Sequence, residues 1–307
     1  MRTALRPEGA RRFKKDGMKL LLLALPFVAL VIAFYYVPLF GWTYAFVNYK
    51  PGFAFSRMPW NNFSSFLKLI SDREIGGVMV NTLAMAFLNL LISPLQVVLA
   101  LLLNEVRNRH FKRAFQTVST LPNFIGWVII FSLSFGMFSS EGMLNQLLKM
   151  LNITDKPVNV LGNASIVWYL QTGLNIWKYT GWGAIVYLAA IAGIDPEIYD
   201  AAKVDGAGRF KTILHITVPG ILPTFLVITL LTVSNMLNVG FEQYLVFYNG
   251  MVAERITVLD LYVYRLGLII HDYSYATAVG MMKTLVSVIL LFTVNGFAKK
   301  VRGESLI

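Results

Sequence analysis

The sequence predicts an all-α membrane protein with six transmembrane helices, and three observations support this fold class. Hydrophobic residues make up 56% of the 307 residues, charged residues only 14%, and the mean hydropathy is +0.61, which is too apolar for an ordinary soluble domain. Basic residues concentrate in alternate loops. Six apolar stretches are each long enough to cross the hydrocarbon layer, which requires about 20 residues; they cover residues 20–42, 78–103, 114–138, 166–194, 218–239 and 276–298.

The first stretch is predicted to be a retained helix rather than a signal peptide. Its apolar run is too long, and it ends in the bulky residues Phe34, Tyr35 and Tyr36 without a small-residue cleavage site. Several stretches contain proline, which would argue against soluble helices. In a membrane, however, neighbouring helices can satisfy the freed backbone groups. The prolines concerned are Pro26, Pro94, Pro122 and Pro223.

The charges of the loops predict the orientation of the chain. The N-terminal tail, the second and fourth loops and the C-terminal tail together carry 17 Lys and Arg residues, whereas the loops on the opposite side carry 8. By the positive-inside rule both termini are cytoplasmic. The expected organisation is a tail of residues 1–18, one transmembrane domain of residues 19–299 and a tail of residues 300–307. The net charge of +11 is therefore explained by the basic residues that set the orientation in the membrane. Membrane lipid is an expected partner, and nucleic-acid binding is not expected.

Residue types that support catalysis or metal binding are scarce. The chain has no Cys, which excludes a disulfide framework, a thiolate nucleophile and a Cys-ligated metal or haem site. His110, His215 and His271 lie far apart in sequence, so a zinc site is not expected. The chain also lacks a phosphate-binding P-loop and contains no Gly-Lys dipeptide. We therefore predict a chain that is not an enzyme and does not itself hydrolyse ATP.

The loop of residues 195–217 is predicted to contain a short helix over residues 196–204. Asp195 is a good N-cap, Pro196 fits the first helical position, and Asp205-Gly206 ends the helix in a turn. A second short helix is expected over residues 207–217. One face of the first helix carries small side chains that let another surface approach closely, at Ile198, Ala201, Ala202 and Asp205. These local signals fit a simple connector and a docking element equally well.

The spacing within this loop resembles the EAA loop of the permease subunits of binding-protein-dependent ABC importers. In those subunits Glu-Ala-Ala is followed at fixed offsets by Gly and by Ile-x-Leu-Pro, and the matching residues are Asp200-Ala201-Ala202, Gly206, Ile216 and Val218-Pro219. Asp200 stands where Glu is usual, which shortens the carboxylate arm, and Val218 replaces Leu, which is a conservative change. Further stretches resemble the complex-saccharide branch of these permeases, at residues 102–106, 187–196, 240–243 and 273–280.

This resemblance implies a type I ABC importer permease fold in the bacterial cytoplasmic membrane, with the loop helix as the coupling (EAA) helix. The implied partners are a second, different permease, two ATPase subunits, an extracytoplasmic solute-binding protein and a carbohydrate substrate. The ATPase subunits would bind ATP and Mg²⁺, and this chain would carry no cofactor. The residues that would couple to an ATPase are Glu197, Asp200, Ala201, Ala202, Asp205, Gly206 and Arg209.

Polar groups within the apolar stretches are candidates for a substrate path, because such groups are costly in a bilayer. Asn235 and Asn238 share a face on a helix, and Glu242 would continue that face if the helix persists. Amides and flat rings suit a sugar, but the amides would serve equally well in hydrogen bonds between helices. The predicted path residues are Lys178, Tyr179, Trp182, Asn235, Asn238, Glu242, Gln243 and Tyr244.

Two lysines in these stretches have alternative interpretations. Lys178 lies deep among aromatic residues, where it can reach a sugar or a carboxylate, or lie over a Tyr or Trp ring as part of the structure. Lys283 is expected to extend to the lipid headgroups from the outer end of the last stretch. Gly181 and Gly183 are predicted to allow close packing between helices.

Three other functions remain as alternatives at this stage. An ion-coupled secondary transporter would use Lys178 and Glu242 as coupling groups, but it would usually show two internal halves with broken helices, and none is visible. An ABC permease for a solute other than a sugar is the second alternative. A membrane-embedded enzyme is the third, and it would need a nucleophile, a base or a metal cluster. The outer segments 48–73 and 241–275 are candidate surfaces for a binding protein, although their aromatic residues also suit the membrane interface.

Overall fold

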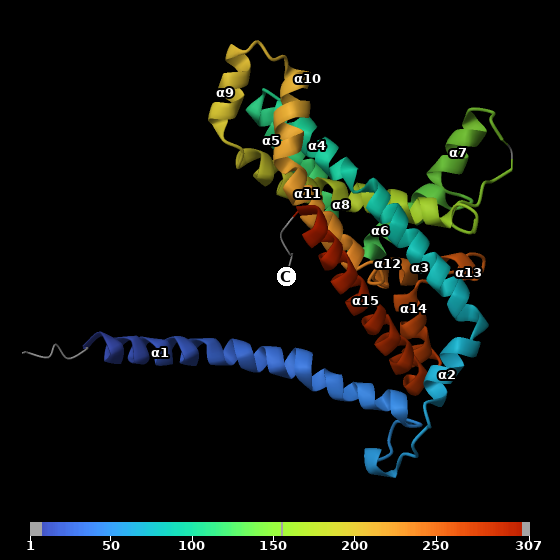
Figure 1. The fold of residues 1–307 in the computed structure, drawn as a ribbon. Coiled ribbons are helices and arrows are strands. Elements are labelled where there is room, and N and C mark those ends of the chain that lie inside the picture. The colour runs from blue at the N-terminus through green and yellow to red at the C-terminus, as the bar shows by residue number, and fades with distance from the viewer. Residues whose placement is uncertain (1–7, 155, 303–307) are drawn as a thin grey trace, which may run out of the picture.

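The computed structural model describes residues 8–154 and 156–302, and helices dominate this part of the chain (Figure 1). Its only β-structure is an isolated bridge between Val47 and Trp60. The all-α prediction is therefore confirmed for the described residues. The helices are α1 (Glu8–Val31), α2 (Ser64–Ser71), α3 (Arg73–Ile92), α4 (Pro94–Glu105), α5 (Arg109–Thr120), α6 (Trp127–Phe138), α7 (Met143–Met150), α8 (Val167–Ala192), α9 (Pro196–Val204), α10 (Arg209–Thr212), α11 (Val218–Ser234), α12 (Glu242–Val246), α13 (Ala253–Ile256), α14 (Leu259–Tyr264) and α15 (Tyr273–Arg302).

Five helical segments of the described chain are long and apolar enough to cross a membrane. They are Lys19–Phe46, Arg73–Glu105, Trp127–Met150, Arg209–Ser234 and Tyr273–Gly296. Helix α8 covers the predicted fourth span and has 26 residues, but it is not one of these five. Its N-terminal half carries Gln171, Asn175 and Lys178, all of which are buried, and such residues lower the hydropathy of the helix.

The chain breaks the predicted third span, 114–138, in the middle. Helix α5 ends at Thr120 and α6 begins at Trp127, and the residues between them form a 3₁₀ turn, Leu121–Phe124, followed by extended backbone. Pro122 has no N–H to continue the helical hydrogen bonds, which favours the break. The apolar segment instead runs from Trp127 to Met150. The predicted bounds of this span were therefore wrong.

The predicted fifth span and the short helix before it also differ from the structure. Residues 209–234 form one helical segment, in which a π-helical turn, Ile213–Thr217, joins α10 to α11. Pro219 and Pro223 lack the N–H that regular helical bonding needs, which fits a wider turn at this place. The helix then ends at Ser234, five residues before the predicted end.

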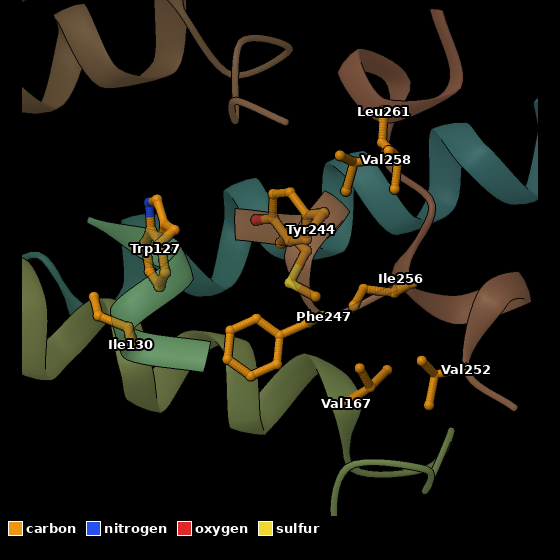
Figure 2. Close-up of a cluster of buried hydrophobic side chains, with 10 residues drawn as sticks. Trp127, Ile130, Val167, Tyr244, Phe247, Val252, Ile256, Val258 and Leu261 are labelled. Atoms are coloured by element: carbon orange, nitrogen blue, oxygen red, sulfur yellow. The ribbon is translucent and has the colours of Figure 1, made fainter. Parts of the chain in front are cut away.

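Helix α8 lies at the centre of the packed helices. Its buried side chains repeat every three or four residues, which is the spacing of one helical face. Ala184, Tyr187 and Ile191 of this face pack with Ala100 of α4 and Ile221 of α11. The other end of α8 joins a second core, where Tyr244 of α12 and Phe247, the residue directly after α12, lie between Val167 and the start of α6 (Figure 2).

Two glycines of α8 allow the close packing that the sequence predicted. A Cβ on Gly181 would lie 1.9 Å from the backbone oxygen of Ser119, so no side chain fits between α8 and α5. A Cβ on Gly183 would lie 2.2 Å from Oε1 of Gln96 in α4. The body of the protein is thus built around α8 at short interhelical distances.

The first apolar segment does not join this body. Helix α1 extends away from the other helices (Figure 1), and none of the residues in the apolar window of Lys19–Phe46 is buried. Only its end is anchored: Nδ2 of Asn61 donates to the carbonyl of Ala45 at 2.8 Å, and Oγ of Ser274 donates to the carbonyl of Val47 at 2.7 Å. The apolar surface of this segment is therefore free to contact lipid or another chain.

Candidate functional site

A cavity of about 840 Å³ opens among α3, α4, α8 and α11, and we call it the polar cavity for the amide, hydroxyl and carboxylate groups in its otherwise mostly apolar lining. Its floor and walls combine side-chain amides, hydroxyls and aromatic rings with aliphatic residues. Nδ2 of Asn175 in α8 donates a hydrogen bond of 3.1 Å to Oδ1 of Asn89 in α3, and both residues line the cavity. The polar and aromatic lining residues are Asn89, Ser93, Gln96, Trp127, Asn175, Tyr179, Thr180, Thr232, Asn235, Asn238, Phe241, Glu242 and Gln243.

The segment after α11 forms one wall of this cavity. Because α11 ends at Ser234, the helix does not persist, and Asn235 and Asn238 do not continue a helical face towards Glu242. A turn brings them together instead: the N–H of Asn238 donates to the carbonyl of Asn235 at 2.8 Å. Asn235, Asn238 and Glu242 all line the cavity. The predicted residues therefore line one cavity, but a turn after α11, rather than a shared helical face, brings them together.

Asp260 of α14 holds this wall in place, and no local sequence pattern indicates this role. Its Oδ2 accepts a hydrogen bond of 2.9 Å from the N–H of Gly240, which has a positive φ of 81°. Its Oδ1 forms an ion pair with Lys283 of α15. The two charged side chains are only 15% and 18% exposed, so Lys283 does not extend to the headgroups, and that prediction was wrong. An oppositely charged partner 23 residues away could not be recognised from local spacing.

Lys178 lies beside the cavity but points into the break between α5 and α6. Its Nζ donates to the carbonyl oxygens of Pro122, Asn123 and Ile125 at 3.3, 3.0 and 2.5 Å. It also lies 5.4 Å from the ring centres of Trp127 and of Tyr179. An ammonium group has three N–H donors, and these carbonyls can use all of them. The geometry supports the structural interpretation of this lysine.

The other predicted path residues divide between the cavity and the core. Tyr179 and Gln243 reach the cavity, and Nε2 of Gln243 also donates to Oε1 of buried Gln171 at 2.7 Å. Tyr244 is fully buried in the core cluster of Figure 2, and Trp182 packs edge-on against Phe124 outside the cavity lining. Asn175 was missed, although it lies one helical turn before Tyr179 and could have been found by that spacing.

The loop helix α9 spans Pro196–Val204, which are the residues predicted from the sequence. The Asp195 side chain accepts a hydrogen bond from the N–H of Glu197 at 2.9 Å and caps the first turn. At the other end Gly206 has a φ of 72°, and the N–H groups of Gly206 and Ala207 donate to the carbonyls of Lys203 and Ala202. This is a Schellman termination, in which glycine provides the left-handed residue.

Few contacts fix α9 to the rest of the molecule, and its apolar residues face outward. The hydroxyl of Tyr199 hydrogen-bonds that of Thr217 at 3.1 Å, and at the start of the following helix α10, Arg209 lies 3.5 Å from a carboxylate oxygen of Glu105. Asp200 forms an ion pair with Lys203 within the helix at 2.8 Å. Large apolar side chains are exposed nearby, with exposed fractions of 49% for Ile198, 88% for Val204 and 82% for Phe210. Such a surface, at the end of a membrane protein, suits a protein partner.

Residues 92–303 match the family described as "Binding-protein-dependent transport system inner membrane component". The chain belongs to this family. The permease is 38% identical to Protein LplB of Bacillus subtilis (strain 168), over 94% of this chain and 90% of that protein. It is 37% identical to the polygalacturonan/rhamnogalacturonan transport system permease protein YteP of the same organism, over 94% and 89% of the two chains.

A solved structure agrees with this assignment over nearly the whole chain. The crystal structure of a bacterial alginate ABC transporter, in complex with an alginate pentasaccharide-bound periplasmic protein, contains a chain that matches with a TM-score of 0.84 and 32% identity. The match covers 96% of this chain and 99% of that chain. The permease therefore has the type I ABC importer permease fold.

Family membership decides between the functions that the sequence left open. The permease is a multi-pass inner-membrane subunit of an ABC importer, and the ATPase is a separate subunit. The ion-coupled transporter and the membrane-embedded enzyme are thereby excluded. Permease subunits of this kind carry no cofactor of their own.

Proposed function

We propose that this permease forms half of the translocation path for an oligosaccharide, and that the polar cavity is its sugar-binding wall. The observation that carries the proposal is the cavity lining, to which amides such as Asn235 and Asn238 and the rings of Trp127 and Tyr179 all contribute. Amide groups hydrogen-bond sugar hydroxyls, and flat rings cover the apolar faces of the sugar. YteP and the alginate transporter are both named for polysaccharides, which supports the same substrate class here.

The charge of the lining indicates which sugar groups this wall recognises. Among the described residues that line the cavity there is no Lys, Arg or His, and Glu242 contributes a carboxylate. Lys178 has its donors directed at backbone carbonyls. This wall is therefore proposed to bind hydroxyl groups, and the carboxylates of an acidic sugar would have to be paired by groups elsewhere on the path.

We propose that α9 is the coupling helix and docks on an ATPase subunit. Its exposed apolar residues, its glycine termination and its resemblance to the EAA loop support this role. The two ATPase subunits would bind ATP and Mg²⁺. Their closure would push on α9 and switch the cavity from inward-facing to outward-facing. The proposed coupling residues are Glu197, Asp200, Ala201, Ala202, Asp205, Gly206 and Arg209.

We propose that α8 is the fourth of six membrane spans and that both termini lie on the side of α9, the cytoplasm. The five apolar segments and the length of α8 support this topology. The terminal tails, 1–18 and 300–307, would flank one transmembrane domain, although residues 1–7 and 303–307 lie outside the described part of the chain. A second permease, different from this one, would cover the exposed first span. An extracytoplasmic binding protein would deliver the sugar.

The cavity is tested by uptake into vesicles that contain the permease with its coexpressed partner subunits. Asn238→Ala is expected to raise the KM for a transported oligosaccharide by about five- to tenfold, because a lost hydrogen bond to a sugar is worth about 1–1.4 kcal/mol. Gln146→Ala is the matched control, since this exposed amide lies in α7, away from the cavity. An unchanged KM for Asn238→Ala would contradict the assignment of the cavity.

The docking role of α9 is tested by copurification of the ATPase subunit. Ile198→Asp places a charge on the exposed apolar surface of α9 and is expected to lower the amount of ATPase that copurifies by at least about tenfold. Ile153→Asp is the control, because this equally apolar side chain is 65% exposed in the segment after α7, far from α9 in the sequence. Equal recovery of ATPase with both variants would contradict docking through α9.

A further inference from the structure

A second cavity, of about 750 Å³, lies at the end of the molecule opposite α9 and carries an excess of positive charge. The residues that line it include three cations, Lys50, Arg57 and Lys68, and one carboxylate, Asp272. Lys68 is paired with Asp272 at 2.7 Å. Within the described residues Lys50 and Arg57 have no ion-pair partner. The cavity therefore attracts an anion.

The position of this cavity along the chain places it at the depth of the lipid headgroups. The first apolar segment ends at Phe46, the second begins at Arg73 and the last begins at Tyr273. The lining residues fall between 48 and 68 and between 272 and 275, which places them between the first two of these ends and at the start of the last segment. Phosphate groups are the anions that a bilayer presents at this depth, and each Lys or Arg near the membrane surface strengthens their binding.

The helix beside the cavity has the exposed surface that acyl chains require. Helix α2 and the residue before it present Phe63, Leu67 and Ile70 with exposed fractions of 53%, 62% and 81%. Lys68, on the same helix, lines the cavity. An apolar surface next to a cationic cavity is the arrangement that binds both parts of a lipid molecule. Phe53 and Met58 add apolar surface to the cavity itself.

We propose that this cavity binds the headgroup phosphate of an anionic phospholipid, with Lys50 and Arg57 as the residues that hold it. The site is separate from the proposed sugar path, because none of its lining residues belongs to the polar cavity. A bound lipid would join the end of the first span to α2 and α15 at the point where Asn61 and Ser274 already anchor it.

The proposal is tested on the importer purified with its coexpressed partners from vesicles of equal parts phosphatidylglycerol and phosphatidylcholine. The two lipids that remain bound are then quantified by mass spectrometry. The wild type is expected to be enriched in phosphatidylglycerol, and the double variant Lys50→Gln with Arg57→Gln is expected to lose this enrichment by about tenfold or more. The control is Lys149→Gln with Lys156→Gln, which removes two exposed lysines outside the cavity and should leave the enrichment unchanged.

Further arms of the experiment separate a lipid site from its alternatives. The charge-conserving pair Lys50→Arg with Arg57→Lys should retain the enrichment, so that failure to fold cannot explain a loss. Full displacement by soluble glycerophosphoglycerol would overturn the lipid assignment, since it would show a phosphate site that does not use the acyl chains. Equal enrichment in the wild type and the Gln double variant would overturn the proposal. So would enrichment only in the permease without its partners, because another subunit would then occupy this surface.

Discussion

The backbone of Gly206 predicts the effect of side chains at this position. Its φ of 72° lies in the left-handed region, and a Cβ there would meet no heavy atom within 4 Å. A β-branched residue is thus opposed by backbone strain of about 1–2 kcal/mol rather than by a clash. Gly206→Val should lower substrate-stimulated ATP hydrolysis by about tenfold, whereas Gly206→Asn should stay close to the wild type.

Gly208 provides the matched control for this prediction. It lies in the same loop with a φ of −72°, and a Cβ on it would also meet no neighbouring atom. Gly208→Val should therefore leave ATP hydrolysis nearly unchanged. Equal losses at Gly206 and Gly208 would show that bulk in the loop, and not the left-handed turn, is what matters.

Asp72 predicts how stability depends on pH. Burial opposes ionisation of its carboxyl group, but hydrogen bonds from the hydroxyls of Tyr262 and Tyr275, both of 2.5 Å, outweigh this effect and lower the pKa of Asp72. A lowered pKa stabilises the folded state above the ordinary aspartate value of about 3.9, and this stabilisation is lost as the pH falls through the lowered pKa.

The measurement is the thermal unfolding temperature in detergent as a function of pH. Asp72→Asn should be less stable than the wild type at neutral pH, and the difference should shrink in acid. Glu141→Gln is the control, because Glu141 is exposed. A difference between Asp72→Asn and the wild type that does not change with pH would contradict the role of the ionised carboxylate.

Single residues could be predicted from the sequence where their partners are close along the chain. The cap at Asp195 and the turn at Gly206 are local signals, and both ends of α9 follow from them. The partners of Lys178 are 53 to 56 residues away, and Asp260 is 20 residues from Gly240. No spacing rule identifies such pairs, so the structural role of Lys178 and the wall-holding role of Asp260 emerged only from the fold.

At the scale of elements, α8 is fixed to α5 by the absence of a side chain at Gly181. Because a Cβ would lie 1.9 Å from the Ser119 oxygen, Gly181→Ala must push the two helices apart at a cost of about 1–3 kcal/mol. Gly173→Ala in the same helix meets no neighbouring atom and should be neutral or stabilising by about 0.5–1 kcal/mol. Thermal unfolding of the two variants measures the contrast, and equal effects would contradict it.

Lys178 is expected to stabilise the break between α5 and α6. Lys178→Met removes the donors to three carbonyls, and leaving buried acceptors unpaired costs about 1–3 kcal/mol. Lys178→Arg should restore part of this stability. If Lys178→Met instead raised the KM for sugar and left the unfolding temperature unchanged, the lysine would be a substrate contact and not a structural group.

Element boundaries were harder to predict than the elements themselves. All six predicted stretches are largely helical, because an apolar run of this length leaves the backbone few alternatives in a membrane. The interruptions were missed for two reasons. Proline is tolerated in membrane helices, so Pro122 alone did not indicate a break, and the early end of α11 accompanies a tertiary bond between Gly240 and Asp260.

At the scale of the whole molecule, the first span distinguishes the isolated permease from the assembled importer. Leu23 is 68% exposed, and the chain contains no native cysteine. Leu23→Cys should therefore react with a small maleimide in the detergent-solubilised permease alone, and it should be protected when a second permease covers the span. Lys149→Cys is the control and should react in both states. Equal reactivity of Leu23→Cys in both states would contradict coverage of this span.

The burial of Asn175 and Lys178 in α8 has a consequence for how the chain enters the membrane. The insertion machinery favours apolar segments, and a lysine at the centre of a helix costs about 2.5–3.5 kcal/mol on that scale. The groups that pair with Asn175 and Lys178, the Asn89 amide and the carbonyls of residues 122–125, all precede α8 in the chain. During synthesis these partners are already in the bilayer when α8 emerges from the ribosome, so the order of the sequence supplies Asn175 and Lys178 with their partners in time.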